Sequence, residues 1–320
     1  MGWKLAGFDV VGGCEIDADQ AALYIDNLGT EEKPATIYRV PIQEFRQIPE
    51  LPSELEGLDV LDGSPPCSTF SMAGNREKDW GVERSFREGQ FEQRLDDLFF
   101  HFIALARRLR PRVVVAENVR GMLAGNARGY VKEIFRAFNE AGYDVQLWDL
   151  DGGRLGVPQR RGRIFFVARR RDLGLPPAEI PASEREVTVG EATEGLVTAG
   201  NPLSGKAAWL WGQVEAGDGF SKATGRKSWF NWFRVSSRVP APTVLANGPF
   251  LTHWEVPAVL SNAALARIGS FPDDYRYGRT KPVYAIGMSV PPLMMQRVAL
   301  SVARMLLRRL DADPHAATGR

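Results

Sequence analysis

One cysteine of this sequence stands where a nucleophile could act. Cys67 follows two prolines in a loop rich in Ser and Thr, directly after the strand-like run 58–62. The carboxyl ends of strands in open α/β sheets are where ligands bind. A thiolate there is a strong nucleophile that can also leave again. A lone cysteine is more often a buried structural residue, but this loop is not typical of a core, and we therefore predict that Cys67 is reactive.

Two further groups of ionisable residues border strand-like runs. Glu117 and Asn118 follow the run 112–116, whose last four residues are apolar, and Arg161 and Arg163 precede the apolar run 164–168. A carboxyl group at such a strand end can move a proton in a reaction. Arginines can hold a phosphate or carboxylate through their fixed fork of donors, although a basic run is more often simply solvated. A thiol, a carboxyl group and a basic cluster are thus predicted at three strand ends.

The order of these residues resembles the DNA cytosine-C5 methyltransferases. Members of that family carry a Pro-Cys loop, then Glu-Asn-Val, then Gln-x-Arg-x-Arg, and all three patterns occur here in that order. Two weaker matches follow at residues 238–244 and 286–291. The resemblance covers nearly the whole chain apart from about residues 170–237.

The resemblance implies methyl transfer to a cytosine that is flipped out of the DNA duplex. Cys67 would attack C6 of the base, and Glu117 would supply a proton or a strong hydrogen bond at N3. Asn118 would hold the Glu117 loop in place. Arg161 and Arg163 would hold the base or its phosphate and orient Glu117.

The resemblance also implies S-adenosylmethionine as the methyl donor. Glu15 would bind the ribose hydroxyls, and the other expected cofactor contacts are Ile16, Pro65, Ser289 and Val290.

The family's first strand and glycine loop are not found in this sequence. Family members begin with a strand and a Phe-x-Gly-x-Gly loop, whereas the match here starts at Ala6-Gly-Phe, with Met1 inside the expected first helix. Backbone amides of such a loop approach the charged end of a ligand closely. We therefore expect the chain to bind its cofactor weakly, whether its start codon is mis-assigned or the truncation is real.

The elements that must position these residues alternate between strands and helices. Residues 94–109 carry apolar side chains on one helical stripe that Pro111 ends, and a second stripe over 131–138 stops at Gly142. This alternation indicates an α/β fold with a doubly wound, mostly parallel, Rossmann-like sheet. We expect a catalytic domain over 1–169, a target-recognition region over 170–237, and a return to the catalytic domain over 238–320 with a closing helix at 291–310.

The recognition region lacks a clear period and is rich in tryptophan and basic residues. It holds Trp209, Trp211, Trp229 and Trp232, half of the eight tryptophans. Interleaved aromatic and basic residues suit nucleic-acid contact, although a small domain also needs tryptophan for its own core. The residues that we expect to contact DNA are Ser68 of the cysteine loop, Lys206, Lys222, Arg226, Lys227 and Arg234.

Composition narrows the class of protein only in part. The 320 residues carry a net charge of +1, with no apolar run long enough to span a membrane and no secretory signal. Two cysteines make neither a disulfide framework nor a metal site, so we expect a reducing cytoplasm and no metal. We expect a monomer that acts on double-stranded DNA, with a restriction endonuclease of the same target sequence as partner.

Two other functions remain open from the sequence. One is a catalytically impaired relative that binds DNA without methylating it, which the departures at the N-terminus would explain. The other is a small-molecule oxidoreductase on a Rossmann sheet. That enzyme would need Gly-x-Gly-x-x-Gly after a first strand, and no such run is present.

Overall fold

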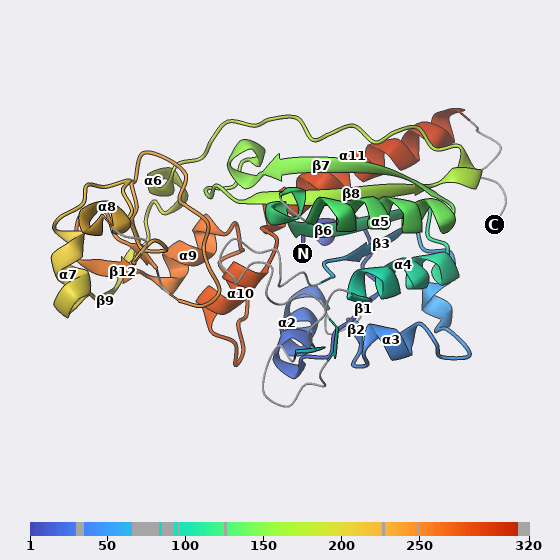
Figure 1. Cartoon of the computed structure of the whole chain (residues 1–320), viewed down its shortest axis with the longest axis horizontal. Coiled ribbons are helices and arrows are strands. Elements are labelled where there is room, and N and C mark those ends of the chain that lie inside the picture. The colour runs from blue at the N-terminus through green and yellow to red at the C-terminus, as the bar shows by residue number, and fades with distance from the viewer. Residues whose placement is uncertain are drawn as a thin grey trace.

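The computed structural model describes residues 1–29, 35–65, 83–84, 93–94, 97–124, 127–225, 228–248 and 250–312. Two lobes lie side by side, one built on a long central sheet and the other on short strands (Figure 1). No helix within these ranges is both long and apolar enough to cross a membrane.

The central sheet has four strands in the order β3-β6-β8-β7. Its first two strands are parallel, and β8 runs antiparallel to both of its neighbours. The connection from β7 to β8 is too short for the crossover that parallel neighbours need, so these two strands are antiparallel. The strands are β3 (Val60–Gly63), β6 (Val113–Val119), β7 (Tyr143–Asp151) and β8 (Gly162–Arg170).

Helices cover both faces of this sheet. Val113 and Val115 of β6 point to one face, where they pack against α1 (Gly2–Leu5) and α11 (Pro292–Ala312). Val114 and Ala116 point to the other face, which α4 (Leu98–Leu109) and α5 (Ala127–Glu140) cover. Burial of side chains on two faces explains why β6 reads as a continuous apolar run. The α/β fold class is confirmed, and α11 lies where the sequence predicts the closing helix.

A smaller unit precedes β3 in the chain. β1 (Gly12–Cys14) and β2 (Thr36–Tyr38) pair in parallel, with α2 (Ala18–Leu28) connecting them. The carboxylate of Asp17 accepts the amides of Asp19 and Gln20 and so caps α2. The remaining elements up to α4 are α3 (Ile42–Phe45), the 3₁₀ turn Ser53–Leu55, and the antiparallel pair β4 (Glu83–Arg84) and β5 (Gln93–Arg94).

The second lobe has a four-stranded sheet in the order β10-β11-β12-β9, and we call it the recognition lobe after the target-recognition region that the sequence predicts at 170–237. Its strands are two to four residues long, which explains why the sequence shows no clear period there. They come from both sides of residue 237, so the boundary expected there runs through this sheet. The elements are α6 (Val189–Ala192), β9 (Ala199–Pro202), α7 (Gly205–Trp211), α8 (Ser221–Thr224), β10 (Phe233–Arg234), β11 (Leu251–Thr252), β12 (Ala258–Leu260), α9 (Asn262–Ile268) and α10 (Pro282–Met288).

Candidate active site

Glu117 and Arg163 form an ion pair at the carboxyl end of β6. The Arg163 Nε lies 2.8 Å from Glu117 Oε1, and the two side chains are 16% and 9% exposed. Glu117 stands opposite Phe165 in the antiparallel register, and Val119 stands opposite Arg163. Arg163 is therefore the diagonal neighbour of Glu117 on the same face, within reach of a long side chain. Strand register alone brings these two charges together.

Burial and a neighbouring carboxylate shift the pKa of Arg163 in opposite directions. Burial lowers the pKa of its guanidinium, and the carboxylate of Glu117 acts against that shift. The pair is thus mutually supporting, because loss of either partner would leave one charge buried without compensation. Arg163 holds Oε1 of Glu117, and Oε2 has no hydrogen-bond partner among the described residues.

Asn118 points away from Glu117 and holds the loop that leads to Cys67. Its Nδ2 donates to Pro65 O at 3.0 Å, and its Oδ1 accepts Val119 N–H at 2.9 Å. Asn118 is 4% exposed, and its amide makes its hydrogen bonds within the protein. The contact joins the carboxyl ends of β3 and β6. Cys67 itself lies outside the described residues.

Arg161 is buried in the contact between the central sheet and the chain that returns from the recognition lobe. The residue is 2% exposed, and its Nη1 and Nη2 donate to Val244 O and Gly287 O at 3.0 and 2.6 Å. Burial lowers the pKa of the Arg161 guanidinium to about 9, with the nearby charge of Arg163 as the second cause. The side chain remains charged at neutral pH and joins three segments that are distant in sequence.

The residues around Arg161 reinforce the same contact. Gln159 is 1% exposed, and its Oε1 accepts Val244 N–H at 3.0 Å. Arg160 N–H donates to Ala241 O, and Ala241 N–H donates to Pro158 O. The hydroxyl of Thr243 donates to Arg160 O at 2.8 Å. Two segments that the sequence marked separately, 159–163 and 238–244, thus pack against each other.

The expected cofactor residues lie on separate elements. Glu15 follows β1, and its Oε1 accepts Asp17 N–H at 2.8 Å. Pro65 is buried at the end of β3. Ser289 follows α10, and its hydroxyl donates to Ala285 O at 2.6 Å. Ile16 and Val290, the other two, are half-buried. Glu15 and Ser289 lie on elements far apart in the sequence, and their joint action at a cofactor remains a prediction.

Cys14 is chemically quiet in this structure. Its Sγ lies 3.1 Å from Val40 O, which the thiol can donate to. Desolvation by the surrounding protein, and secondly the carboxylate of Glu15, raise the pKa of the Cys14 thiol to about 11. A thiol that stays protonated near neutral pH is a poor nucleophile, although its side chain reaches the surface.

The residues expected to contact DNA have different surroundings. Lys206 is exposed on α7, and Lys222 is exposed but forms an ion pair with Asp218 at 2.6 Å. Arg234 donates to Trp254 O and Val214 O, and its guanidinium lies 3.7 Å above the centre of the Trp211 ring. These contacts make Arg234 part of the lobe's own packing. Ser68, Arg226 and Lys227 lie outside the described residues.

A second group of exposed cations escaped the sequence reasoning. Arg276, Arg279 and Lys281 lie in the loop between α9 and α10, and none of them forms an ion pair with another described residue. The loop is held in place by Asn27 at the end of α2, whose amide makes two 2.9 Å hydrogen bonds to the backbone of Arg276. The sequence does show three cations within six residues. It does not show that α2 anchors their loop, because that contact depends on the tertiary structure.

Comparison with known proteins identifies relatives over nearly the whole chain. The family model for C-5 cytosine-specific DNA methylases matches residues 1–304. The type II methyltransferase M.XorII of Xanthomonas oryzae is 26% identical over 97% of this chain and 82% of its own length. M.NgoMIV of Neisseria gonorrhoeae, also a type II methyltransferase, is 29% identical over 81% of this chain and 80% of its own. A solved structure of Spodoptera frugiperda DNMT2 superposes with a TM-score of 0.62, at 17% identity over 94% of this chain and 95% of that one, which supports the fold.

Proposed function

The chain belongs to the C-5 cytosine-specific DNA methylase family, and from this premise we propose that it methylates C5 of a flipped cytosine through a covalent bond to Cys67. S-adenosylmethionine supplies an electrophilic methyl group when it is bound. The single observation that carries the proposal is the buried Glu117–Arg163 pair beside the loop that Asn118 holds. The pair orients a carboxyl group next to Asn118, whose side chain donates to Pro65 O, and this supports a role for Glu117 beside the loop that carries Cys67.

The first step that we propose joins the Cys67 sulfur to C6 of the base. The thiolate gives its electron pair to C6, and the ring electrons move toward N3, which takes up a proton. The protonated carboxyl form of Glu117 gives that proton from Oε2 and becomes the carboxylate that Arg163 binds through Oε1. The base becomes an enamine whose C5 can attack a methyl group.

The second step restores the aromatic ring. C5 forms a bond to the incoming methyl carbon, while the bond from that carbon to the donor's sulfonium sulfur breaks and leaves its electron pair on sulfur. A base then removes the proton from C5, the electron pair of that C–H bond forms the C5–C6 double bond, and the bond from C6 to sulfur breaks to release the Cys67 thiolate. N3 returns its proton to Glu117. Atoms and charges balance, and Cys67 is regenerated. The roles assigned to this chain are attack, proton delivery and orientation.

The residues present fit S-adenosylmethionine in part. A carboxylate after a parallel strand, as at Glu15, suits ribose hydroxyls, and Asp17 N–H holds one of its oxygens. Ser289 donates both its hydroxyl and its backbone N–H to Ala285 O, so it can offer a cofactor only its backbone C=O, the acceptor side of its hydroxyl oxygen and its carbon atoms. We propose that Glu15 and Ile16 bind the ribose side and that Pro65 and Val290 line the rest.

Two wider proposals accompany the reaction. The type II names of the relatives support a restriction endonuclease with the same target sequence as a functional partner in the cytoplasm.

The net charge of the chain is only +1, so contact with DNA depends on positive side chains that gather on one part of the surface. Lys206 and the loop carrying Arg276 present exposed cations for this contact.

Trapping of the covalent bond tests the mechanism. Duplex DNA with 5-fluorocytosine at the target position blocks the final elimination, because fluorine cannot leave as a proton does. With S-adenosylmethionine present, the parent chain and Cys14→Ala should both form an adduct that survives denaturation, and Cys67→Ala should form none. An adduct that persists in Cys67→Ala would overturn the assignment of the nucleophile.

A further inference from the structure

The four residues Trp229-Phe230-Asn231-Trp232 form a strained turn in the recognition lobe, just before β10. Trp232 N–H donates to Trp229 O at 3.0 Å and closes the turn. Trp229 adopts a φ of +68°, a conformation that side chains with a Cβ rarely take. Such strain persists only when the surroundings over-determine it, and it concentrates at binding and catalytic sites.

The two tryptophans anchor this turn in the core of the lobe. Their rings stack on Phe220, which is fully buried, with centroids 6.2 and 5.7 Å away. Trp232 also meets the ring of Phe250 edge-to-face at 5.5 Å. The tryptophans therefore serve the packing of the lobe, and the turn between them is held rigidly.

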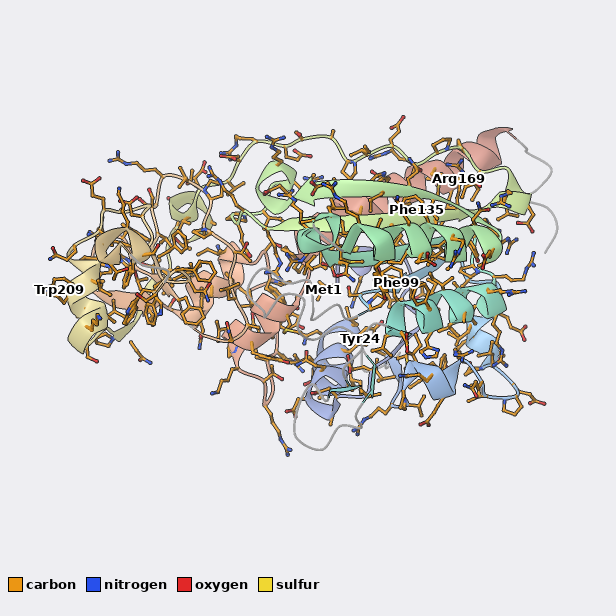
Figure 2. All side chains as sticks on the ribbon, viewed as in Figure 1. Met1, Tyr24, Phe99, Phe135, Arg169 and Trp209 are labelled. Atoms are coloured by element: carbon orange, nitrogen blue, oxygen red, sulfur yellow. The ribbon has the colours of Figure 1, made fainter. Side chains whose placement is uncertain are left out.

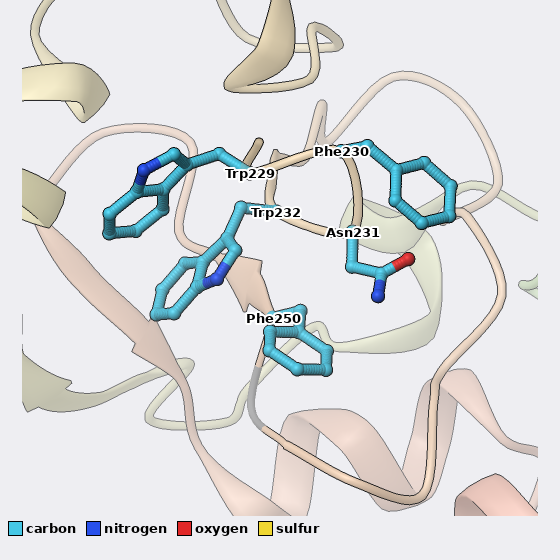
Figure 3. Close-up of a pocket in the computed structure, with 5 residues that line it drawn as sticks. All are labelled: Trp229, Phe230, Asn231, Trp232 and Phe250. Carbon is cyan, nitrogen blue, oxygen red and sulfur yellow. The ribbon is translucent and has the colours of Figure 1, made fainter. Parts of the chain in front are cut away.

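The two middle residues of the turn face outward. Phe230 is 51% exposed, and Asn231 is half-buried with no hydrogen-bond partner for its amide among the described residues. Figure 3 shows the indoles on one side of the turn and Phe230 on the other, with Asn231 between Phe230 and Phe250. All five side chains line a hollow of about 320 Å³. An apolar ring and an unpaired amide are thus presented side by side on a rigid support.

We propose that Phe230 and Asn231 read one A·T base pair of the DNA target. An Asn amide has one donor and one acceptor edge, which match N6–H and N7 of adenine in the major groove. An exposed aromatic ring beside it suits contact with the thymine methyl group or with a base face. This inference rests on the proposed function and adds the residues that choose the sequence around the target cytosine.

Selection from a random duplex library tests this assignment. The parent chain is allowed to bind and to methylate the library, and bound sequences and bisulfite-resistant cytosines are read separately. Asn231→Ala should lower the preference for A·T at one position by about 5- to 150-fold and leave the other positions unchanged. Phe230→Ala should relax the same position. Matched controls are Asn201→Ala on β9 and Trp209→Ala on α7, both exposed in the same lobe.

The outcomes separate this inference from the function on which it rests. A parent chain that selects no sequence and methylates no cytosine overturns the proposed function and this inference with it. A parent chain with a defined target, together with both variants keeping the preference at every position, overturns this inference alone. If the alanine variants fail to fold, Asn231→Asp retains the side-chain shape and should move the preference from adenine toward cytosine. A folded Asn231→Asp with unchanged preference would also reject the assignment.

Discussion

Arg161→Met removes a charged side chain that is 2% exposed and holds Val244 and Gly287 through their carbonyl oxygens. Two hydrogen bonds from a charged donor contribute about 3–6 kcal/mol together. The substitution also removes a buried charge and an Nε that has no partner, which offsets part of the loss. We therefore expect the free energy of unfolding to fall by about 2–4 kcal/mol.

The geometry around Gly287 makes this contact sensitive to small shifts. A Cβ built on Gly287 would lie 2.3 Å from Ala246 N, so α10 and the returning chain are already in closest approach. The carbonyls that Arg161 binds belong to this contact. We therefore regard Arg161 as a positioning residue. Its loss should weaken the packing of residues 244 and 287 against the central sheet, and any effect on the reaction should follow from that.

Urea unfolding of the parent, Arg161→Met and Arg160→Met measures this effect. Arg160 is the matched control, because its side chain is 57% exposed and its nearest carboxylate oxygen is 3.8 Å away. Arg160→Met should change the free energy of unfolding by no more than about 0.5 kcal/mol. The reasoning is refuted if Arg161→Met is as stable as Arg160→Met yet has lost methylation, because Arg161 would then act on the base or its phosphate.

Three further substitutions test the site and the DNA surface. Glu117→Gln should slow methyl transfer by about 10²–10⁴-fold in single-turnover assays, with DNA affinity kept; turnover near the parent rate would mean that the carboxyl group is structural. Glu15→Ala should weaken cofactor binding about 10- to 150-fold by calorimetry, as expected for a lost charged hydrogen bond; unchanged affinity would remove Glu15 from the cofactor site. Replacing Arg276, Arg279 and Lys281 together by Gln should reduce the slope of log affinity against log salt by about 2.7; an unchanged slope would exclude this loop from contact with phosphates.

The tryptophans of the recognition lobe differ in their surroundings, and composition could not predict which of them are exposed. The four tryptophans at 209, 211, 229 and 232 suggested nucleic-acid contact or a local core, and the structure divides them. Trp209 is 60% exposed at the outer end of the recognition lobe (Figure 2), whereas Trp229 and Trp232 pack with buried Phe220. Strands of two to four residues leave no period from which that division could be predicted.

The sequence by itself determined the longer helices and strands and the order in which the candidate residues occur along the chain. Helical periodicity placed α4, α5 and α11, and the apolar run before Glu117 marked β6, because these segments are long enough for burial to impose a period. Short motifs singled out Cys67, Glu117 and Arg163 one by one as candidate catalytic residues.

Only the tertiary structure decided which of these residues meet. Glu117 and Arg163 are 46 positions apart in the sequence, and antiparallel register makes them partners. Arg161, only two residues before Arg163, points instead to carbonyls at 244 and 287, and Arg234 binds two carbonyls of its own lobe. An arginine in sequence is equally suited to phosphate, carboxylate or carbonyl oxygen, and the acceptors within its reach are fixed by the packing of distant segments.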